Sequence, residues 1–377
     1  MASTNKKKGE KGSNARGRHI RASWLARGGL IFSQIFYISA RFCVMKRTGA
    51  RAFFPPFLPF SRNAKMQTFC IHAARLPQRL FVMTSARSLP PLPASANADL
   101  HCHSTASDGT LQAEELASRA AANGVQLWSL TDHDEISAQA RAREAAHSHG
   151  LRYLTGVEIS VSFAGDAVHI VGLGFDLDEQ SALARGLAAN RGGRGPRAEK
   201  MAAGLEKAGI KGAYEGALRH AGNPDLLSRT HFARFLVESG VCRDTHEVFR
   251  KYLIDGKPGY VPHHWASLGE TIEWITQAGG VAVIAHPARY RLKPVEKYAL
   301  FTEFKARGGH AIEVVTGSHT PAEATHYASI AREFGLAASR GSDFHSPSES
   351  RTQLGQLPPL PPNLTAVWQL PQLAGRY

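Results

Sequence analysis

From residue 98 onward, the sequence predicts an α/β protein built from parallel β/α units. Short apolar strands alternate with helix-like runs, which is the pattern of such units. About seven strands can be counted, and a residue able to bind a metal ion stands at or just past the end of nearly every one. In a β/α barrel the carboxyl ends of the strands converge on one face. We therefore expect these polar side chains to meet.

The first strand leads into "ADLHCHSTASDG", residues 98–109, where His101 and His103 are separated by one residue. Residues i and i+2 of a strand point to the same side, so both imidazoles can bind one ion. The intervening Cys102 then points away from them and packs as a thiol. Taken alone, the motif also fits a polar turn after a strand.

The later elements repeat this arrangement along the chain. A helix is expected over residues 111–123, ending at Gly124, and an alanine-rich helix ends at Gly150. Strands are expected at 125–130, 151–157, 167–175, 279–286, 310–315 and 335–345, and they are followed by or contain His133, Glu158, His169, His286, His319, Asp343 and His345.

The joint recurrence of such residues favours a shared metal site. Individually, His286 could cap a turn, Glu158 could be a surface acid, and His169 could be a hydrogen-bonded core histidine. Together, nine candidate metal ligands recur at equivalent places: His101, His103, Asp108, His133, Glu158, His169, His286, Asp343 and His345.

This mixed imidazole and carboxylate set contains no thiolate, which suits Zn, Mn or Fe. Nine ligands are too many for one ion and fit about two or three divalent ions. Clusters of this kind generate a hydroxide near neutral pH and stabilise the entering and leaving oxygens of phosphoryl transfer. The constellation therefore predicts phosphoester hydrolysis.

Six motifs, met in order, resemble those of PHP (polymerase and histidinol phosphatase) domains over roughly residues 97–350: "DLHCHSTASDG", "SLTDHDE", "TGVEIS", "VHIVGLGF", "VAVIAHPARY" and "GSDFHS". With the "YLIDGKPGYVP" stretch and a long helical insertion, the chain is most similar to stand-alone bacterial phosphoesterases of this family. Those enzymes hydrolyse the 3′-phosphate of 3′,5′-nucleoside bisphosphates and degrade short RNA from the 5′ end.

The resemblance implies a distorted (β/α)7 TIM-like barrel with a helical insertion and a cluster of two or three divalent ions, Mn most of all, with Fe or Zn as alternatives. It allots one ion to His101, His103, Glu158 and Asp343, a second to Glu158, His169 and His286, and a third to Asp108, His133 and His345. The nucleophile it implies is a metal-bound hydroxide held by His101, His103, Glu158 and His286, so no serine or cysteine nucleophile is needed.

The strand rhythm stops between residues 191 and 264, where short helices separated by glycines predict an insertion that serves as a lid. The barrel would then comprise residues 97–190 and 265–377, the latter with a C-terminal tail. The glycine-rich "RGGRGPR", residues 191–197, is expected to be a flexible hinge. Four side chains are candidates for holding the non-reacting phosphate: Arg229, His231, Arg289 and His319.

The net charge of +14 is carried by the N-terminal segment, because residues 1–97 hold 17 lysines or arginines and one acid, whereas the remainder has 28 against 30. Composition therefore predicts no surface for duplex DNA. Residues 1–96 are expected to be a disordered basic extension. A signal peptide, a transit peptide and a reading frame extended upstream of a start at Met83 are the alternatives, and we favour the last.

Cys43, Cys70, Cys102 and Cys242 show no paired spacing, which predicts free thiols in a reducing, cytoplasmic compartment. We expect a monomer that acts on a small phosphorylated nucleotide and on short single-stranded RNA, with no membrane partner. Histidinol phosphate hydrolysis is the second enzymatic hypothesis. A non-catalytic or proofreading PHP module serving a polymerase is the hypothesis from another class.

Overall fold

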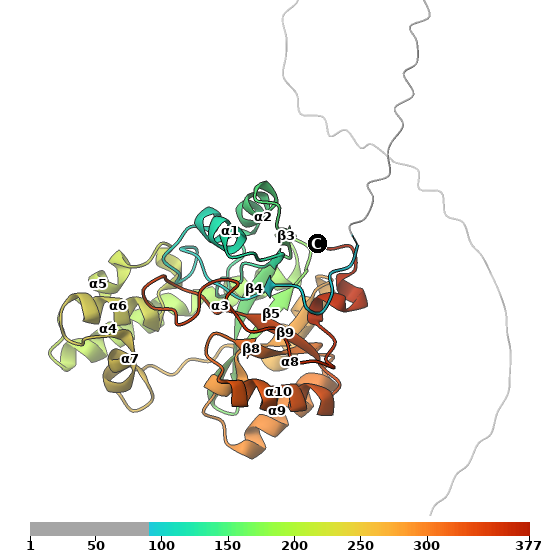
Figure 1. Ribbon diagram of the computed structural model, residues 1–377. Helices are drawn as coiled ribbons and strands as arrows, with labels where there is room; N and C mark the ends of the chain where they lie inside the picture. The colour runs from blue at the N-terminus through green and yellow to red at the C-terminus, as the bar shows by residue number, and fades with distance from the viewer. Residues whose placement is uncertain (1–89) are drawn as a thin grey trace, which may run out of the picture. The chain divides into compact units, whose positions relative to one another are not determined.

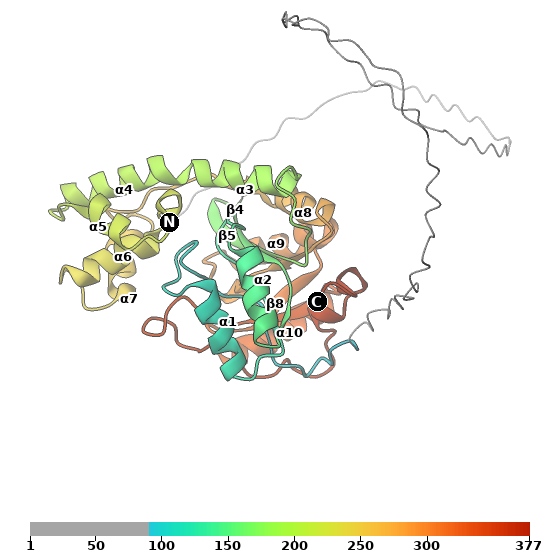
Figure 2. The same ribbon diagram turned by 90° about the horizontal axis from the view of Figure 1, so that it is seen from above.

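The computed structural model describes residues 90–377 (Figure 1). The hypotheses about the basic extension concern residues that lie almost wholly outside this range. The described residues form a mixed α/β body and, beside it, a group of short helices (Figures 1 and 2). Among them, no helix is long and apolar enough to cross a membrane.

The strands form two sheets. The first is parallel and has the order β1 (Ala98–Asp99), β2 (Leu127–Trp128) and β3 (Arg152–Tyr153). The second has the order β6-β4-β5-β7-β8-β9, with bounds β4 (Gly156–Phe163), β5 (Asp166–Leu173), β6 (Ala266–Ser267), β7 (Val281–Ile284), β8 (Ala311–Thr316) and β9 (Ala337–Gly341).

The expectation of purely parallel units is wrong at β5, which pairs antiparallel with both β4 and β7. The reason is the connection between β4 and β5. Ala164 and Gly165 link the two strands with φ values of 49° and 83°. Two consecutive positive φ values make the tight turn of a two-residue hairpin, and such a hairpin joins antiparallel strands only.

Isolated bridges connect the two sheets on both sides. Cys102 pairs with Phe344 beyond β1 and β9, and His133 pairs with Glu158 between the β2 loop and β4. One hydrophobic cluster also draws on both sheets: Ala98 and Leu127 pack with Val171, Val283, Ala311 and Ala337. The segments that follow β1, β2 and β9 are thereby held side by side.

Six helices accompany the strands: α1 (Ala113–Ala122), α2 (Gln139–Ser148), α3 (Ala182–Gly192), α8 (Leu268–Gln277), α9 (Pro294–Ala306) and α10 (Pro321–Glu333). Capping boxes define where two of them begin. Ser267 with Glu270 caps α8, and Thr320 with Glu323 caps α10, so backbone N–H groups of the first turn are satisfied.

The inserted helices are α4 (Arg194–Lys207), α5 (Ala213–Arg219), α6 (Arg229–Glu238) and α7 (Thr245–Val248). They have a hydrophobic core of their own, which includes Met201, Leu205, Phe232, Leu236 and Leu253. We call residues 191–264, which carry these helices, the helical insertion.

The expected flexible hinge at residues 191–197 is instead helical. The helix α3 continues to Gly192, and α4 begins at Arg194 after a single intervening glycine. Figure 2 shows the two helices following each other along almost one line. Arg194 and Arg197 are buried here, so their partners, rather than the glycines, determine the local structure.

Candidate metal centre

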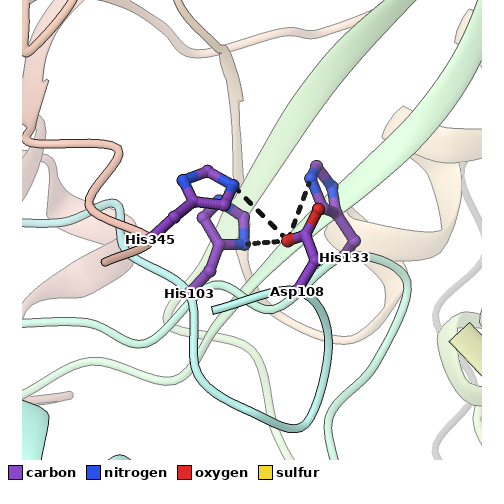
Figure 3. A group of neighbouring side chains, drawn as sticks. All are labelled: His103, Asp108, His133 and His345. Atoms are coloured by element: carbon purple, nitrogen blue, oxygen red, sulfur yellow. Dashed lines mark ion pairs between the residues drawn. The ribbon is translucent and has the colours of Figure 1, made fainter. Parts of the chain in front are cut away.

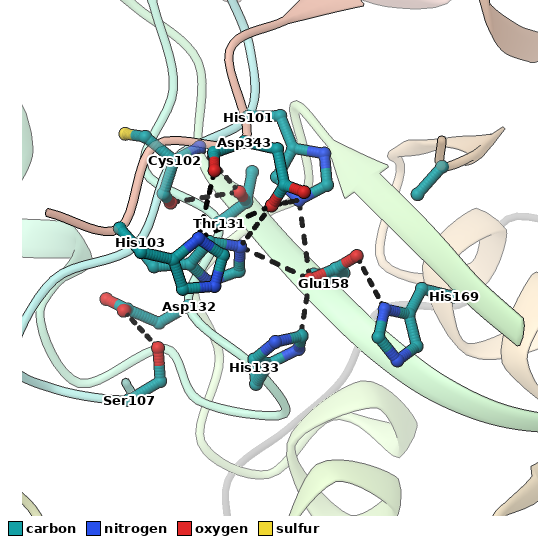
Figure 4. A network of polar contacts seen from close by, with 12 residues as sticks. His101, Cys102, His103, Ser107, Thr131, Asp132, His133, Glu158, His169 and Asp343 are labelled. Carbon is teal, nitrogen blue, oxygen red and sulfur yellow. Dashed lines mark hydrogen bonds and ion pairs between the residues drawn. The ribbon is translucent and has the colours of Figure 1, made fainter. Parts of the chain in front are cut away.

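All nine predicted metal ligands lie together, and Figures 3 and 4 label all of them except His286. They fall into three overlapping groups, in each of which one ligand atom per residue lies within 4.8 Å of the others. The groups are His101 with Glu158, His286 and Asp343; His103 with Asp108, His133 and His345; and His133 with Glu158 and His169.

Glu158, on β4, is the central carboxylate of the site. Each of its oxygens faces imidazole nitrogens, as Figure 4 shows for part of the set. The distances are 2.8 Å to His169 Nδ1, 2.8 Å to His286 Nε2, 2.9 Å to His133 Nδ1, and 3.3 Å to the Nε2 atoms of His101 and His103. A single carboxylate can therefore be shared between neighbouring ions.

Asp108 is the centre of the second group (Figure 3). Its Oδ1 lies 3.4 Å from His345 Nε2, 3.8 Å from His133 Nε2 and 4.0 Å from His103 Nδ1. Asp108 comes from the loop after β1, whereas His133 follows β2 and His345 follows β9. The three loops are adjacent because β1 pairs with β2 and contacts β9.

The grouping differs from the allocation that the resemblance implied at three histidines, of which His133 now belongs to two groups. His103 belongs to the group around Asp108, although its Nε2 also lies 3.3 Å from Asp343 Oδ1. His286 belongs to the group of His101 and Asp343. His103 and His286 each lie close to ligands of two groups. The order of the residues in the sequence does not tell which group such a histidine joins.

The carboxylates and histidines of the cluster shift one another's pKa values. Burial alone would raise the pKa of Glu158, but His169, His133 and His101 hold it well below the usual range. Burial would likewise lower the pKa of His103, but the carboxylates of Asp343 and Glu158, each 3.3 Å from its Nε2, raise it to about 10. The pKa of His101 is raised as well, whereas burial lowers the pKa of His133 and lowers that of His286 to about 4. A cation at the carboxylates can replace the protons of His101 and His103.

The imidazole nitrogens and carboxylate oxygens of the site point toward one another, but many of them form no hydrogen bond. Among the described residues, fourteen buried side-chain nitrogen and oxygen atoms have no partner with hydrogen-bond geometry, and eight belong to this cluster. They include His101 Nε2, both ring nitrogens of His103, Asp108 Oδ1, Glu158 Oε2 and Asp343 Oδ1. Buried polar atoms are rarely left unpaired. Their convergence fits divalent ions that bind imidazole and carboxylate together.

Two ligands are held in strained backbone conformations. His286 has a φ of 22° and Asp343 a φ of 53°, which non-glycine residues seldom adopt. The Asp343 carboxylate also pairs with Arg289. The backbone N–H of His286 donates to Glu313 Oε2 at 2.6 Å. These contacts fix the direction in which both side chains enter the site.

Glu313 is a functional residue that the sequence analysis missed. It is buried in β8, and its Oε1 lies 2.8 Å from His101 Nδ1, on the side of the ring away from Glu158. A carboxylate on the second nitrogen fixes the tautomer and orientation of a metal-ligating histidine. The signal in the sequence was a lone carboxylate inside the apolar "HAIEVV" strand.

Asp132 and Cys102 support the loops without entering the site. Asp132 accepts hydrogen bonds from the Ser104 and Ser107 hydroxyls at 2.7 and 2.6 Å, and so holds the loop that carries Asp108 (Figure 4). Cys102 is buried, and its sulfur accepts a hydrogen bond from Trp128 Nε1 at 3.2 Å. Cys102 and Cys242 are both free thiols.

A cavity of about 440 Å³ opens onto the cluster. Five arginines line it as well, Arg194, Arg197, Arg229, Arg289 and Arg291, together with two acids beyond the cluster, Asp166 and Asp255. Arg194 pairs with Asp134 and Arg289 with Asp343, whereas Arg197 and Arg229 form no ion pair with a carboxylate of the described residues. Burial, together with Arg229 and Arg194, lowers the pKa of Arg197 to about 10. Such a lining attracts an anion.

Of the four predicted phosphate-holding residues, the structure places Arg229 and Arg289 in the cavity wall and the two histidines elsewhere. His231 is fully buried at the start of α6, where its Nδ1 accepts the Ser228 N–H at 3.0 Å. His319 lies 3.0 Å from the Val314 carbonyl through Nδ1 and stacks on Tyr327. Both side chains stabilise local structure. Arg194 and Arg197 are the cavity-lining arginines that sequence analysis missed.

The buried His231 makes stability depend on pH. Burial lowers its pKa to about 4, so the folded protein keeps it neutral where the unfolded chain binds a proton. This contribution is complete above about pH 6.5 and declines as the pH falls towards 4. Between pH 7 and pH 5 we expect wild type to lose about 2 kcal/mol more stability than His231→Gln in urea unfolding. Equal losses in the two proteins would contradict this role.

Comparison with known proteins agrees with this geometry. The PHP domain model matches residues 99–234. The chain is 50% identical over 274 residues to a 3′,5′-nucleoside bisphosphate phosphatase of Chromobacterium violaceum, covering 73% of this chain and 96% of that one. It is 43% identical over 274 residues to the 5′-3′ exoribonuclease Rnm of Escherichia coli K12, covering 72% and 92%.

A solved structure of an amidohydrolase from Chromobacterium violaceum, with bound sulfate and no metal, matches with a TM-score of 0.71 and 49% identity. The match covers 74% of this chain and 97% of that one. Likeness of sequence and of structure thus extends over nearly the whole of these relatives. The chain belongs to the PHP domain family.

Proposed function

We propose that the protein is a metal-dependent phosphoesterase that hydrolyses the 3′-phosphate of 3′,5′-nucleoside bisphosphates and degrades short RNA from the 5′ end. One observation carries the proposal: a converging set of unsatisfied imidazole and carboxylate atoms opens onto a cavity that five arginines also line. The names of the two relatives support the substrate class, since one is a bisphosphate phosphatase and the other a 5′-3′ exoribonuclease.

The nine clustered side chains would hold two or three divalent ions, with Mn²⁺ the first candidate and Fe or Zn the alternatives. When bound, such ions supply Lewis-acid stabilisation and lower the pKa of water to near neutrality. Glu158 would be shared between ions, because imidazoles from several strands surround both of its oxygens. The site offers no cysteine nucleophile, since the Cys102 thiol is buried against Trp128.

The chain itself would bind and orient the substrate. A scissile phosphate placed at the cluster lies next to Arg289, whose guanidinium lines the cavity beside Asp343. Arg197 and Arg229, from the insertion, form no ion pair with a carboxylate of residues 90–377 and would bind the second phosphate. A guanidinium is well suited to phosphate through paired hydrogen bonds. The arrangement therefore favours a substrate with two anionic groups over one with a single phosphate.

The insertion would act as a lid over this cavity. Residues 191–264 contribute Arg194, Arg197, Ser228, Arg229 and His263 to the wall, so that closing on substrate would exclude water. Residues 97–190 and 265–377, which carry all nine strands of the described chain, would together form a distorted TIM-like barrel. The bridges at both sheet edges and the hydrophobic cluster shared by the two sheets support that closure.

The test is phosphate release by the full chain, with Mn²⁺, from adenosine 3′,5′-bisphosphate, adenosine 3′-monophosphate and histidinol phosphate. We expect the bisphosphate to be the preferred substrate and 5′-mononucleotide to be the product. Release from histidinol phosphate alone would replace the substrate assignment. No release from any of the three, in protein that binds Mn²⁺, would favour a non-catalytic PHP module. Short RNA with a 5′-phosphate is the next substrate to compare.

A further inference from the structure

The junction between α3 and α4 connects the insertion to the metal cluster through a buried guanidinium. Arg194 is the first residue of α4 and is 4% exposed. Its Nη2 donates to Asp134 Oδ2 and, at 3.1 Å, to the Ser160 hydroxyl. Asp134 is completely buried, so the two charges face each other without water. An ion pair of this kind fixes two chain segments relative to each other.

Both oxygens of the Asp134 carboxylate accept hydrogen bonds at this junction. The backbone N–H and hydroxyl of Ser160 donate to it at 2.9 and 3.0 Å, and Asn190 Nδ2 donates at 3.0 Å. Asn190, on α3, also donates to the Ser160 carbonyl at 3.0 Å and accepts the Ala266 N–H at 3.1 Å. The network thus joins the loop after β2, the strand β4 and both helices.

Asp134 directly follows His133 in the chain, and its position determines where that imidazole lies. Asp134 has a φ of 50°, a conformation that needs support from outside the loop. Its N–H donates to the Glu158 carbonyl at 2.8 Å, which holds the loop against β4. His133 belongs to two of the three ligand groups, so a small displacement of the loop would disturb both.

The other side of Arg194 belongs to the cavity. Its guanidinium lies 4.8 Å from the centre of the Trp265 ring, and its buried Nε has no hydrogen-bond partner among the residues that the structure describes. Gly193, just before it, has no room for a side chain, because a Cβ there would lie 2.3 Å from the His263 ring. Arg194 is therefore held firmly between the cavity wall and the loop of His133.

We propose that Arg194 is a positioning residue for the metal ligand His133 and acts through Asp134. The insertion thereby helps to set the affinity of the metal centre as well as lining the substrate cavity. The inference rests on the proposed metal centre, but its test needs no substrate. Residues that orient a metal ligand typically change metal affinity or activity by about 10- to 100-fold when they are replaced.

The experiment measures Mn²⁺ affinity of the full chain by equilibrium dialysis and elemental analysis for wild type, Arg194→Gln, Arg194→Lys, Asp134→Asn and the Asp134→Asn/Arg194→Gln double variant. Arg185→Gln is the matched control, since Arg185 is an exposed arginine of α3 that contacts the Gln180 carbonyl only. Thermal melting of each metal-free protein shows whether it is folded. The values of kcat and KM at saturating Mn²⁺ are measured in parallel.

We expect Arg194→Gln to weaken the binding of at least one ion by about 10- to 100-fold and to lower kcat, with Arg185→Gln unchanged. The double variant should bind no more weakly than the weaker single variant, because both changes remove the same contact. Arg194→Lys, which retains the charge, should recover part of the affinity and remains informative if the glutamine variant does not fold.

The inference is overturned if folded Arg194 variants bind Mn²⁺ as tightly as Arg185→Gln, or if the losses of the two single variants add in the double variant. Failure of the proposed function gives a different result. In that case wild type binds Mn²⁺ but releases no phosphate, and the effect of Arg194 on metal affinity is still measured.

Discussion

Replacing Glu158 by glutamine will abolish both full metal loading and phosphate release. Glu158 faces five imidazoles, and glutamine keeps its size while removing the negative charge and one acceptor oxygen. Charge stabilisation by bound ions is worth several kcal/mol in the transition state. A loss of about 4 kcal/mol corresponds to a fall in kcat of about 10³-fold.

Elemental analysis and phosphate release on the same preparation test this prediction. Glu333→Gln is the matched control, because Glu333 is exposed at the end of α10. We expect Glu158→Gln to hold at least one ion fewer per chain than the control. Retention of wild-type metal content and turnover would show that the cluster around Glu158 is not the reactive centre.

The Arg197→Ala/Arg229→Ala double substitution will remove the preference for two phosphates. Each guanidinium lines the cavity without forming an ion pair with a carboxylate in the described part of the chain, so each can bind the phosphate that does not react. A hydrogen bond to a charged group contributes about 1.5–3 kcal/mol. Losing two should lower kcat/KM for adenosine 3′,5′-bisphosphate by about 10²- to 10³-fold or more. The value for adenosine 3′-monophosphate should change little.

The matched control is Arg219→Ala/Arg243→Ala, which removes two exposed arginines from the same segment of the chain, each paired with a surface carboxylate. The control should keep the wild-type ratio of the two substrates. Equal losses on bisphosphate and monophosphate by the Arg197→Ala/Arg229→Ala protein would mean that these arginines do not select for the second phosphate.

The candidate ligands could be predicted from the sequence because each lies in a short local pattern. His101 and His103 share one side of an extended segment, and His286 and Asp343 follow apolar strands directly. The topology of β/α units then brings the strand ends to one face. That ligands from distant parts of the chain meet at one site could therefore be predicted without knowing how the side chains pack.

The residues that support the site could not be predicted in the same way, because their partners are distant in sequence. Arg194 pairs with Asp134 across 60 positions, and Glu313 meets His101 across 212. The glycines around Arg194 suggested a flexible hinge, whereas its buried charge requires a fixed partner. Conversely, His231 resembled a ligand for phosphate but contacts the Ser228 backbone three residues earlier.

The direction of β5 was missed for a local reason. The pattern of "AVHIVGLGF" indicates a buried strand of either direction. The information lay in the two residues before it, since Ala164 and Gly165 form the hairpin turn that makes β5 antiparallel to β4. His169 still reaches Glu158, because the two strands are adjacent.

The most direct test of a metal-dependent phosphoesterase is phosphate release from adenosine 3′,5′-bisphosphate by the full chain, first stripped of metal with a chelator and then supplied with Mn²⁺. We predict that the stripped protein is folded and inactive, and that Mn²⁺ restores release of phosphate with 5′-mononucleotide as the other product. Undiminished release by protein shown by elemental analysis to contain no metal would contradict the account.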